Sequence, residues 1–322
     1  MTGDAALLAE VAGERRVIDH LRHLATPPAS VRAQYADGIL VDFGDDVWEL
    51  LECVPNYRHG VVGFNAAYVG MLRSLAWLVA RLGSDVEARD LTARASDLAA
   101  SVLRQYAGRG RWHIARPGGN DVIGHCLDFQ LVTAEMAADI QPTLAAELAD
   151  FAEGVLIDGD WMHALAPDDP IAPFADRPDH GASGAFAGWP GATSYGLIQL
   201  GRHDAAADFL SRIHRATSGA LWGQAVEAIG GGRYRVAERG ASNRESSAGV
   251  AATEAILAGL FGINADLRSL DTPPGISASR FGNVRGVRVI GFDLPPAARD
   301  WRTTLQAALD DGHGRLSQGT DQ

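Results

Sequence analysis

The chain has 322 residues, 47% of them hydrophobic, and a formal net charge of −12. This hydrophobic share is ordinary for a globular protein and is enough to build a large core. The acidic charge argues against nucleic acids and anionic membranes as partners, because both require a basic surface.

The N-terminal stretch, residues 1–21, is amphipathic and carries acidic residues early. It lacks the basic start and apolar core of a secretory signal. No run approaches roughly eighteen uninterrupted apolar residues, so we predict no transmembrane helix. Cys53 and Cys126 have the spacing of neither a metal site nor a redox pair. Two free thiols without a signal predict a cytoplasmic protein.

Apolar spacing predicts helices along most of the chain. The first covers 5–25 and is stopped by Pro27 and Pro28, and a short one covers 29–35. Residues 36–60 are acidic and aromatic, and we predict a long loop with one helical turn near 48–52. A clear helix follows over 60–83, ended by Gly83, and Ser84 is expected to cap the next one.

The middle of the chain alternates loops with helices. Gly and Pro residues predict a loop over 109–124, followed by helices over 127–138 and from Pro142 to about 155. Residues 159–188 form a predicted loop rich in Trp, Phe and His. Loops of this length in compact domains are usually functional.

A helical hairpin is predicted over 190–214, with Gly201 at the break and Asp204 at the N-cap of its second helix. A short β-hairpin around 233–236 and a helix over 246–261 follow. Valines beyond 264 predict short strands, and the last dozen residues read as a disordered tail.

This order of helix pairs and loops predicts an all-α fold, an α/α toroid of antiparallel helix pairs with long loops at one face. We expect the toroid, the catalytic-type domain, to cover 1–263. A C-terminal extension with short β-like strands would cover 264–310, and a disordered tail 311–322.

The chemistry is expected from carboxylates beside aromatic residues in the loops. No Gly-rich phosphate loop follows a strand, and neither G-x-S-x-G nor H-E-x-x-H is present. Glycoside hydrolysis needs one protonated carboxyl to release the leaving oxygen and one ionised carboxylate to activate water. Aromatic faces would pack on the sugar rings.

The order of these features resembles the catalytic region of the six-hairpin glycosidases, especially the clan of trehalase and the processing α-glucosidases. Their E-S-G-W-D loop before a V-D-L-N helix is similar to Asp42–Asp46 before Val62–Asn65. Their R-G-x-x-W segment is similar to Phe186–Trp189, and their base glutamate matches Glu227. Their closing L-F-G-L is similar to 260–263. The resemblance covers roughly 40–263, although Asp42 replaces a glutamate and the Arg-Gly pair is absent.

The resemblance implies an inverting glycosidase that acts on a small glycoside or oligosaccharide. Asp46 or Asp42 would be the general acid and Glu227 the base, with carboxyls about 6.5–9.5 Å apart. Each has a structural alternative: Asp46 as a first-turn acid of a helix, Glu227 as a solvated loop acid. Glu52 sits between apolar neighbours that would raise its pKa, or it pairs with Arg58.

Residues in the loops ahead of the helices are expected to hold the sugar. Tyr57 and His59 could instead pack structurally at a helix start, and the tryptophans could belong to the core. Glu245 competes with Glu227 for the base role, and His125 is expected to cap a helix. The expected substrate-binding set is Glu52, Tyr57, His59, Asn65, Arg177, Asp179, His180, Trp189, Trp222 and Glu245.

Two other functions stay open. An isomerase or epimerase would transfer protons through His59, His125 or His180, and a lyase would use Tyr57 as base and Arg58 for a uronate. A carbohydrate-binding toroid without catalysis is the third possibility. Ten histidines without close pair spacing argue against zinc, so we expect no metal and no cofactor. The oligomeric state is left open.

Overall fold

The computed structural model describes residues 5–26, 32–35, 38–46, 50–52, 54–175, 177–217, 225–229, 233–236 and 246–262. The chain divides into two compact units, one of residues 1–21 with 261–322 and one of residues 22–260. The strands expected beyond 264 and the expected tail lie outside the described residues, and the predicted domain limits stay predictions.

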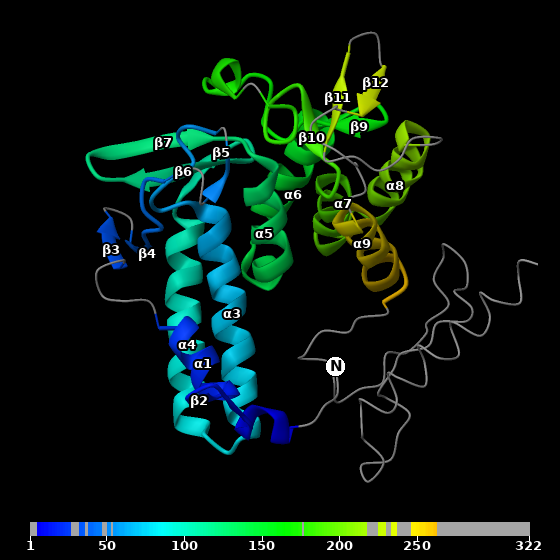
Figure 1. The fold of residues 1–322 in the computed structure, drawn as a ribbon. Helices are drawn as coiled ribbons and strands as arrows, with labels where there is room; N and C mark the ends of the chain where they lie inside the picture. Colours follow the sequence, from blue (N-terminus) through cyan, green and yellow to red (C-terminus); the bar gives the residue numbers. More distant parts are fainter. Residues whose placement is uncertain are drawn as a thin grey trace, which may run out of the picture. The chain divides into compact units, whose positions relative to one another are not determined.

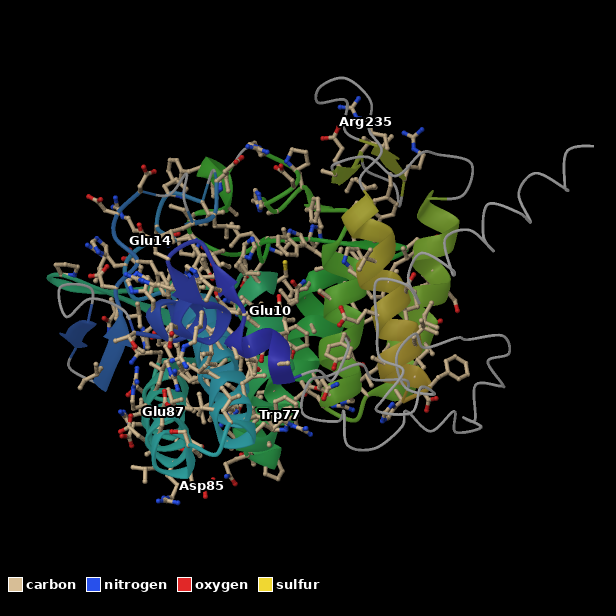
Figure 2. The ribbon with its side chains drawn as sticks, turned by 60° about the horizontal axis from the view of Figure 1, so that its bottom comes forward. Glu10, Glu14, Trp77, Asp85, Glu87 and Arg235 are labelled. Atoms are coloured by element: carbon tan, nitrogen blue, oxygen red, sulfur yellow. The ribbon has the colours of Figure 1, made fainter. Side chains whose placement is uncertain are left out.

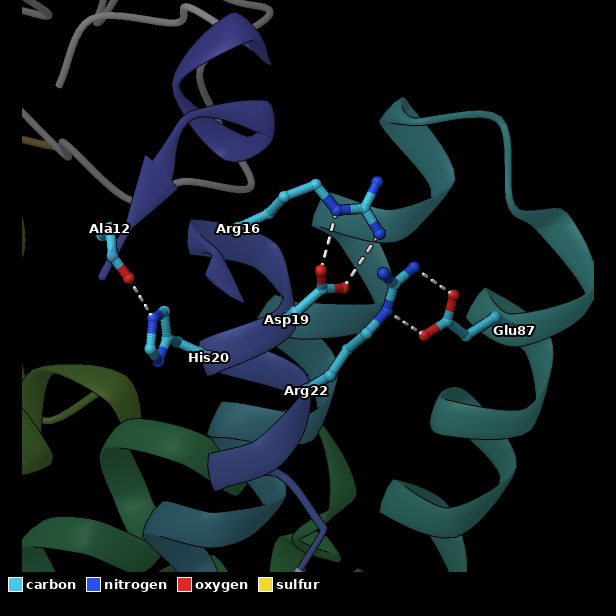
Figure 3. A network of polar contacts seen from close by, with 6 residues as sticks. All are labelled: Ala12, Arg16, Asp19, His20, Arg22 and Glu87. Atoms are coloured by element: carbon cyan, nitrogen blue, oxygen red, sulfur yellow. Dashed lines mark hydrogen bonds and ion pairs between the residues drawn. The ribbon is translucent and has the colours of Figure 1, made fainter. Parts of the chain in front are cut away.

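The first unit begins with a 3₁₀ turn, Ala5–Ala9, and two short antiparallel strands, β1 (Val11–Ala12) and β2 (Arg15–Arg16). A helix over 5–25 was expected, but α-helix is found only as α1 (Val17–Leu24), whose residues 17–21 belong to this unit and 22–24 to the second. Gly13 turns the chain at a φ of +67° and breaks the helix there. Within this unit Arg16 pairs with Asp19, and the His20 ring bonds the Ala12 carbonyl (Figure 3).

The second unit is built on helices in pairs (Figure 1). The predicted breaks at Gly83 and Gly201 are confirmed, and both glycines have a positive φ. Ser84 is the N-cap of its helix, although its hydroxyl bonds the Glu87 side chain. The helices are α3 (Val62–Arg81), α4 (Asp85–Leu103), α5 (Cys126–Met136), α6 (Pro142–Phe151), α7 (Trp189–Gln199), α8 (His203–Thr217) and α9 (Ser246–Glu254).

Helices α3, α5, α7 and α9 pack side by side in chain order, and α3 and α7 also pack against the next helix of their own hairpins, α4 and α8. Asp204 lies in the first turn of α8 rather than at its N-cap, because α8 begins at His203. Arg22 pairs with Glu87 of α4 at 2.7 Å (Figure 3). The second unit is rich in helices, as predicted. The closure of its helix pairs into a toroid stays a prediction.

The helix α3 is long and apolar enough in composition to cross a membrane, but 56% of its most apolar window is buried inside the protein. The guanidinium carbon of Arg81 lies 4.2 Å from the ring centroid of Trp77, and Trp77 is labelled in Figure 2. Burial of this kind is typical of the central helix of a globular core.

The described residues also form short antiparallel sheets, so the all-α prediction is too narrow. The stretch 109–124, predicted as a loop, contains a β-hairpin in which Trp112 and Ile114 alternate inward. The helix predicted over 29–35 is wrong, because 32–35 is a strand. The strands are β3 (Arg32–Tyr35), β4 (Gly38–Val41), β5 (Tyr106–Gly108), β6 (Arg111–Arg116), β7 (Gly119–Ile123), β8 (Ile157–Asp158), β9 (Trp161–Met162), β10 (Gly184–Phe186), β11 (Ala225–Ala228) and β12 (Tyr234–Val236).

Two apolar clusters fill the second unit. One gathers Tyr57, Val61 and Leu127 around the starts of α3 and α5. The other includes Trp161 of β9 and Phe209 of α8. Trp189 packs against both clusters, so the first residue of α7 lies where the two meet.

Candidate functional site

The starts of α3, α5 and α7 are joined by the loops that precede them (Figure 1). Gly60, just before α3, pairs through its backbone with Ala115 of β6. Cys126, the first residue of α5, donates its N–H to the Ala164 carbonyl at 2.8 Å, and Ala164 donates to the carbonyl of Gly184 in β10 at 2.7 Å. Strand β10 contacts α7. Side chains from three helix starts therefore gather in one place.

Tyr57 and Asp128 form a buried pair across the starts of α3 and α5. The Tyr57 hydroxyl donates to Oδ1 of Asp128 at 2.8 Å, and the N–H of Gly63 donates to the same oxygen at 2.7 Å. Burial raises the pKa of Asp128 to about 7, while the bonds from Tyr57 and Gly63 lower it. Burial also raises the pKa of Tyr57. A carboxyl with a pKa near neutrality suits general acid or base chemistry.

His125 caps α5, as predicted. Its Nδ1 accepts the N–H of Leu127 at 3.0 Å. Burial lowers the pKa of His125 to about 3, and the charge of His180 lowers it as well, so the ring is neutral at physiological pH. Its Nε2 is buried and has no partner of full hydrogen-bond distance and angle among the described residues, while a weaker backbone contact with His180 raises the pKa of the ring.

His180 and Trp189 complete this group of rings. The ring centroids of His125 and His180 lie 6.4 Å apart, and Trp189 lies 6.4 Å from His125 and 6.2 Å from His180. The indole N–H of Trp189 donates to the Asp179 carbonyl at 3.0 Å, which fixes the ring. Burial lowers the pKa of His180, with Asp179 raising it and Arg177 lowering it.

Arg177 ties two acidic residues from distant parts of the chain. Its guanidinium pairs with Glu52 through Nη1 and with both oxygens of Asp179 through Nε and Nη2. The Asp179 side chain is 2% exposed, whereas that of Glu52 is 44% exposed. The apolar setting and the Arg58 partner expected for Glu52 are therefore wrong, because the chain brings Arg177 to it instead.

Asp42 and His59 form a second polar pair, ahead of α3. Asp42 accepts the Gly44 N–H at 2.8 Å and lies 3.1 Å from Nδ1 of His59. His59 has a φ of +63°, a rare conformation for a residue with a Cβ, and its backbone bonds Gly44 and Phe43. Strain of this kind often marks functional sites. Asp46, in the same loop, is exposed.

Asn65 was expected to bind substrate, but its side chain bonds the protein backbone. Its Oδ1 accepts the Val41 N–H at 2.8 Å, and its Nδ2 donates to the carbonyls of Val41 and Val61 at 3.1 and 2.9 Å. With its polar atoms used in this way and no exposure to solvent, Asn65 anchors β4 on α3.

Glu227 lies on β11, where it pairs in register with Gly184 of β10 and Arg235 of β12. Its carboxylate pairs with Nε of Arg235, which is labelled in Figure 2. The side chain of Glu227 is 20% exposed, so it is less open than a solvated loop acid would be.

The structure brings five of the expected residues into one cluster. Two further polar pairs are Asp42 with His59 and Glu227 with Arg235. Trp222 and Glu245 lie outside the described residues. The cluster holds Glu52, Arg177, Asp179, His180 and Trp189, with Tyr57 reached through His125.

Sequence reasoning missed Asp128. It lies on α5 between apolar residues and would have been placed among the surface acids of a helix. One signal was available: Asp128 follows the capping His125 by three residues, so both side chains leave the same first turn. In the described residues, no group of three or more His, Cys, Asp or Glu residues is arranged to hold a metal ion.

No family model and no curated protein matches this chain. Among solved structures, an uncharacterized conserved protein from Thermus thermophilus has a TM-score of 0.46 and 17% identity, over 61% of this chain and 46% of that one. A GH63 mannosylglycerate hydrolase from the same organism, in complex with glucose, has a TM-score of 0.44 and 15% identity, over 61% and 47%. The Tris complex of that hydrolase has a TM-score of 0.43 and 16% identity, over 61% and 45%. The chain spans less than half the length of each.

Proposed function

We propose that the protein is a glycoside hydrolase acting on a small glycoside or oligosaccharide. The observation that supports it is the group of buried polar atoms without hydrogen-bond partners among the described residues: Nε2 of His125, Oδ2 of Asp128 and Nδ1 of His180. The two histidine rings lie beside Trp189, and Asp128 is in the same first turn of α5 as His125. Unpaired polar groups beside aromatic faces suit a ligand rich in hydroxyls, since hydroxyls pair with the former and ring carbons pack on the latter.

The roles proposed for the carboxyls follow the resemblance of the acidic loop and of Glu227 to the six-hairpin glycosidases. Asp42 accepts the Gly44 N–H and contacts His59, so its oxygens are already engaged within the loop. Asp46 is therefore the better candidate for the general acid. Glu227 pairs with Nε of Arg235 on the neighbouring strand, and it is proposed as the base that activates water.

The test is hydrolysis of a panel of aryl α- and β-glycosides and of disaccharides, with proton NMR to identify the anomer formed first. Inversion is expected. Asp46→Asn and Glu227→Gln should each lower kcat by about a hundredfold or more, the usual effect of losing an acid or base. Glu87→Gln is the matched control, because Glu87 also pairs with an arginine but lies on α4. Wild-type rates for Glu227→Gln would remove that residue from the mechanism.

The two neighbouring histidines favour a second candidate, a sugar isomerase or epimerase. His125 and His180 are within 6.4 Å of each other, centroid to centroid, and each could exchange a proton with a carbon beside a carbonyl. Incubation of free sugars in deuterium oxide distinguishes the two functions. An isomerase or epimerase incorporates deuterium at a sugar carbon, whereas a hydrolase leaves the carbon-bound hydrogens in place.

A further inference from the structure

His125 and Asp128 present two buried polar atoms from the first turn of α5. Each residue is 1% exposed. Nδ1 of His125 accepts the Leu127 N–H, so this nitrogen carries no proton. In the neutral ring the proton is then on Nε2, which makes Nε2 a donor. Nε2 has no partner of full hydrogen-bond distance and angle among the described residues, and a weaker backbone contact of the ring with His180 raises its pKa.

Asp128, in its ionised form, supplies the matching acceptor. Its Oδ1 is occupied by the Tyr57 hydroxyl and the Gly63 N–H. Its Oδ2 is buried and has no hydrogen-bond partner in the described part of the chain. Since buried polar atoms in folded proteins are almost always paired, one donor and one acceptor left in the same helical turn indicate a ligand.

The surroundings of the two atoms restrict that ligand. The Tyr57 ring centroid lies 5.9 Å from that of His125, and the rings of His180 and Trp189 lie 6.4 Å from it. An anionic group is disfavoured, because it would meet the carboxyl of Asp128 without a facing cation from Tyr57, Trp189 or the neutral His125 ring. A hydroxyl, which both donates and accepts, fits each atom.

We propose that Nε2–H of His125 and Oδ2 of Asp128 together bind two neighbouring hydroxyls of a neutral sugar. This inference rests on the proposed carbohydrate function and names the part of the site that selects the sugar. A sugar with a vicinal diol can satisfy the donor and the acceptor at once. A sugar lacking either hydroxyl leaves one buried atom unpaired, which binding sites penalise strongly.

Two variants remove the pair while keeping the fold. His125→Asn keeps a good N-cap for α5 but loses the imidazole donor. Asp128→Asn turns its oxygen toward Tyr57 and Gly63 and replaces the acceptor by an amide donor. The matched control is Asp169→Asn, because Asp169 is also buried with a raised pKa, but its two oxygens accept the N–H groups of Gly124 and Ile171.

The probes are D-glucose, D-mannose and D-galactose, measured by saturation-transfer NMR and calorimetry. At least one of these sugars should bind the wild type, and each variant should lower the affinity for that sugar by about tenfold or more. Asp169→Asn should bind as the wild type does. Glu227→Gln should keep the affinity and lose turnover, so binding and catalysis are separated.

Unchanged affinity in folded His125→Asn and Asp128→Asn would overturn the pair and leave the hydrolase proposal standing. Should the variants unfold, monodeoxy analogues of the bound sugar test the wild type directly. Removal of the hydroxyl at each of two adjacent ring positions should weaken binding. Equal affinity for every analogue contradicts the proposed pair. A wild type that neither binds nor hydrolyses any sugar contradicts both proposals.

Discussion

The hydroxyl of Tyr57 donates to Oδ1 of Asp128 at 2.8 Å and joins residues 71 positions apart in the chain. The bond connects the loop before α3 to the first turn of α5, and Gly63 donates to the same oxygen. The two helix starts are therefore held together by a carboxyl that burial brings to a pKa of about 7. The contact links the stability of the unit to its protonation state.

Tyr57→Phe removes this bond and leaves the buried carboxyl with fewer donors. We expect the free energy of unfolding to fall by about 1–3 kcal/mol, the cost of an unmet buried polar group. Urea denaturation measures it. Tyr106→Phe is the control, because the Tyr106 hydroxyl bonds an exposed carboxylate, Glu147. Tyr106→Phe should lower the free energy of unfolding by less than about 1 kcal/mol. Equal losses for the two variants would contradict a special role of the buried pair.

Asp128→Asn should change how stability depends on pH. The pKa of Asp128 is raised from 3.8 to about 7 in the folded protein, so between these values the folded state binds more protons than the unfolded state. The wild type therefore loses stability relative to Asp128→Asn as pH rises from about 4 to about 7, at up to about 1.4 kcal/mol per pH unit.

The comparison of wild type with Asp128→Asn is needed because His125 has the opposite effect. Its pKa is lowered from 6.5 to about 3, so the unfolded state binds the extra proton and the fold weakens as pH falls through that window. Subtracting the two unfolding curves cancels this contribution. If the unfolding free energy of the wild type minus that of Asp128→Asn stayed constant or increased with pH, Asp128 would not be protonated in the fold.

Arg177→Met should destabilise the protein strongly, because it leaves the carboxylate of Asp179 buried without its guanidinium partner. Loss of one member of a buried ion pair costs about 3–5 kcal/mol. The double variant with Asp179→Asn should recover part of that loss in urea denaturation. Arg202→Met removes the partner of exposed Asp150 and should cost less than about 1 kcal/mol. A double variant as unstable as Arg177→Met would argue against this coupling.

The helices could be predicted from the sequence because their apolar periodicity survives in the fold. The spacing over 60–83 predicted α3, and Gly201 predicted the break between α7 and α8, where its φ is +79°. The hairpin of β6 and β7 was missed, since its Gly and Pro residues were taken as loop signals. The inward alternation of Trp112 and Ile114 carried the strand signal.

The candidate site was predicted in part for a different reason. Arg177, Asp179, His180 and Trp189 are close in sequence, so one polar, aromatic loop pointed to all of them. The pairing of Arg177 with Glu52, 125 residues away, depends on tertiary packing that local patterns do not carry. Asp128 was missed because, apart from its spacing of three from His125, a lone acid on a helix has no sequence feature that separates a buried carboxyl from a solvated one.

Gly191→Ala tests the close approach of α7 and α9. A Cβ at Gly191 would lie 2.5 Å from the Ala252 nitrogen and 2.6 Å from the Ala251 carbonyl carbon, both backbone atoms that cannot rotate away. We expect a loss of about 1–3 kcal/mol in the free energy of unfolding, because one helix must shift. Gly154→Ala is the control, since its Cβ would meet no atom within 4 Å. This substitution should leave stability unchanged or raise it by up to about 1 kcal/mol through helix propensity. If Gly191→Ala were as stable as Gly154→Ala by urea denaturation, the tight contact between α7 and α9 would be absent in solution.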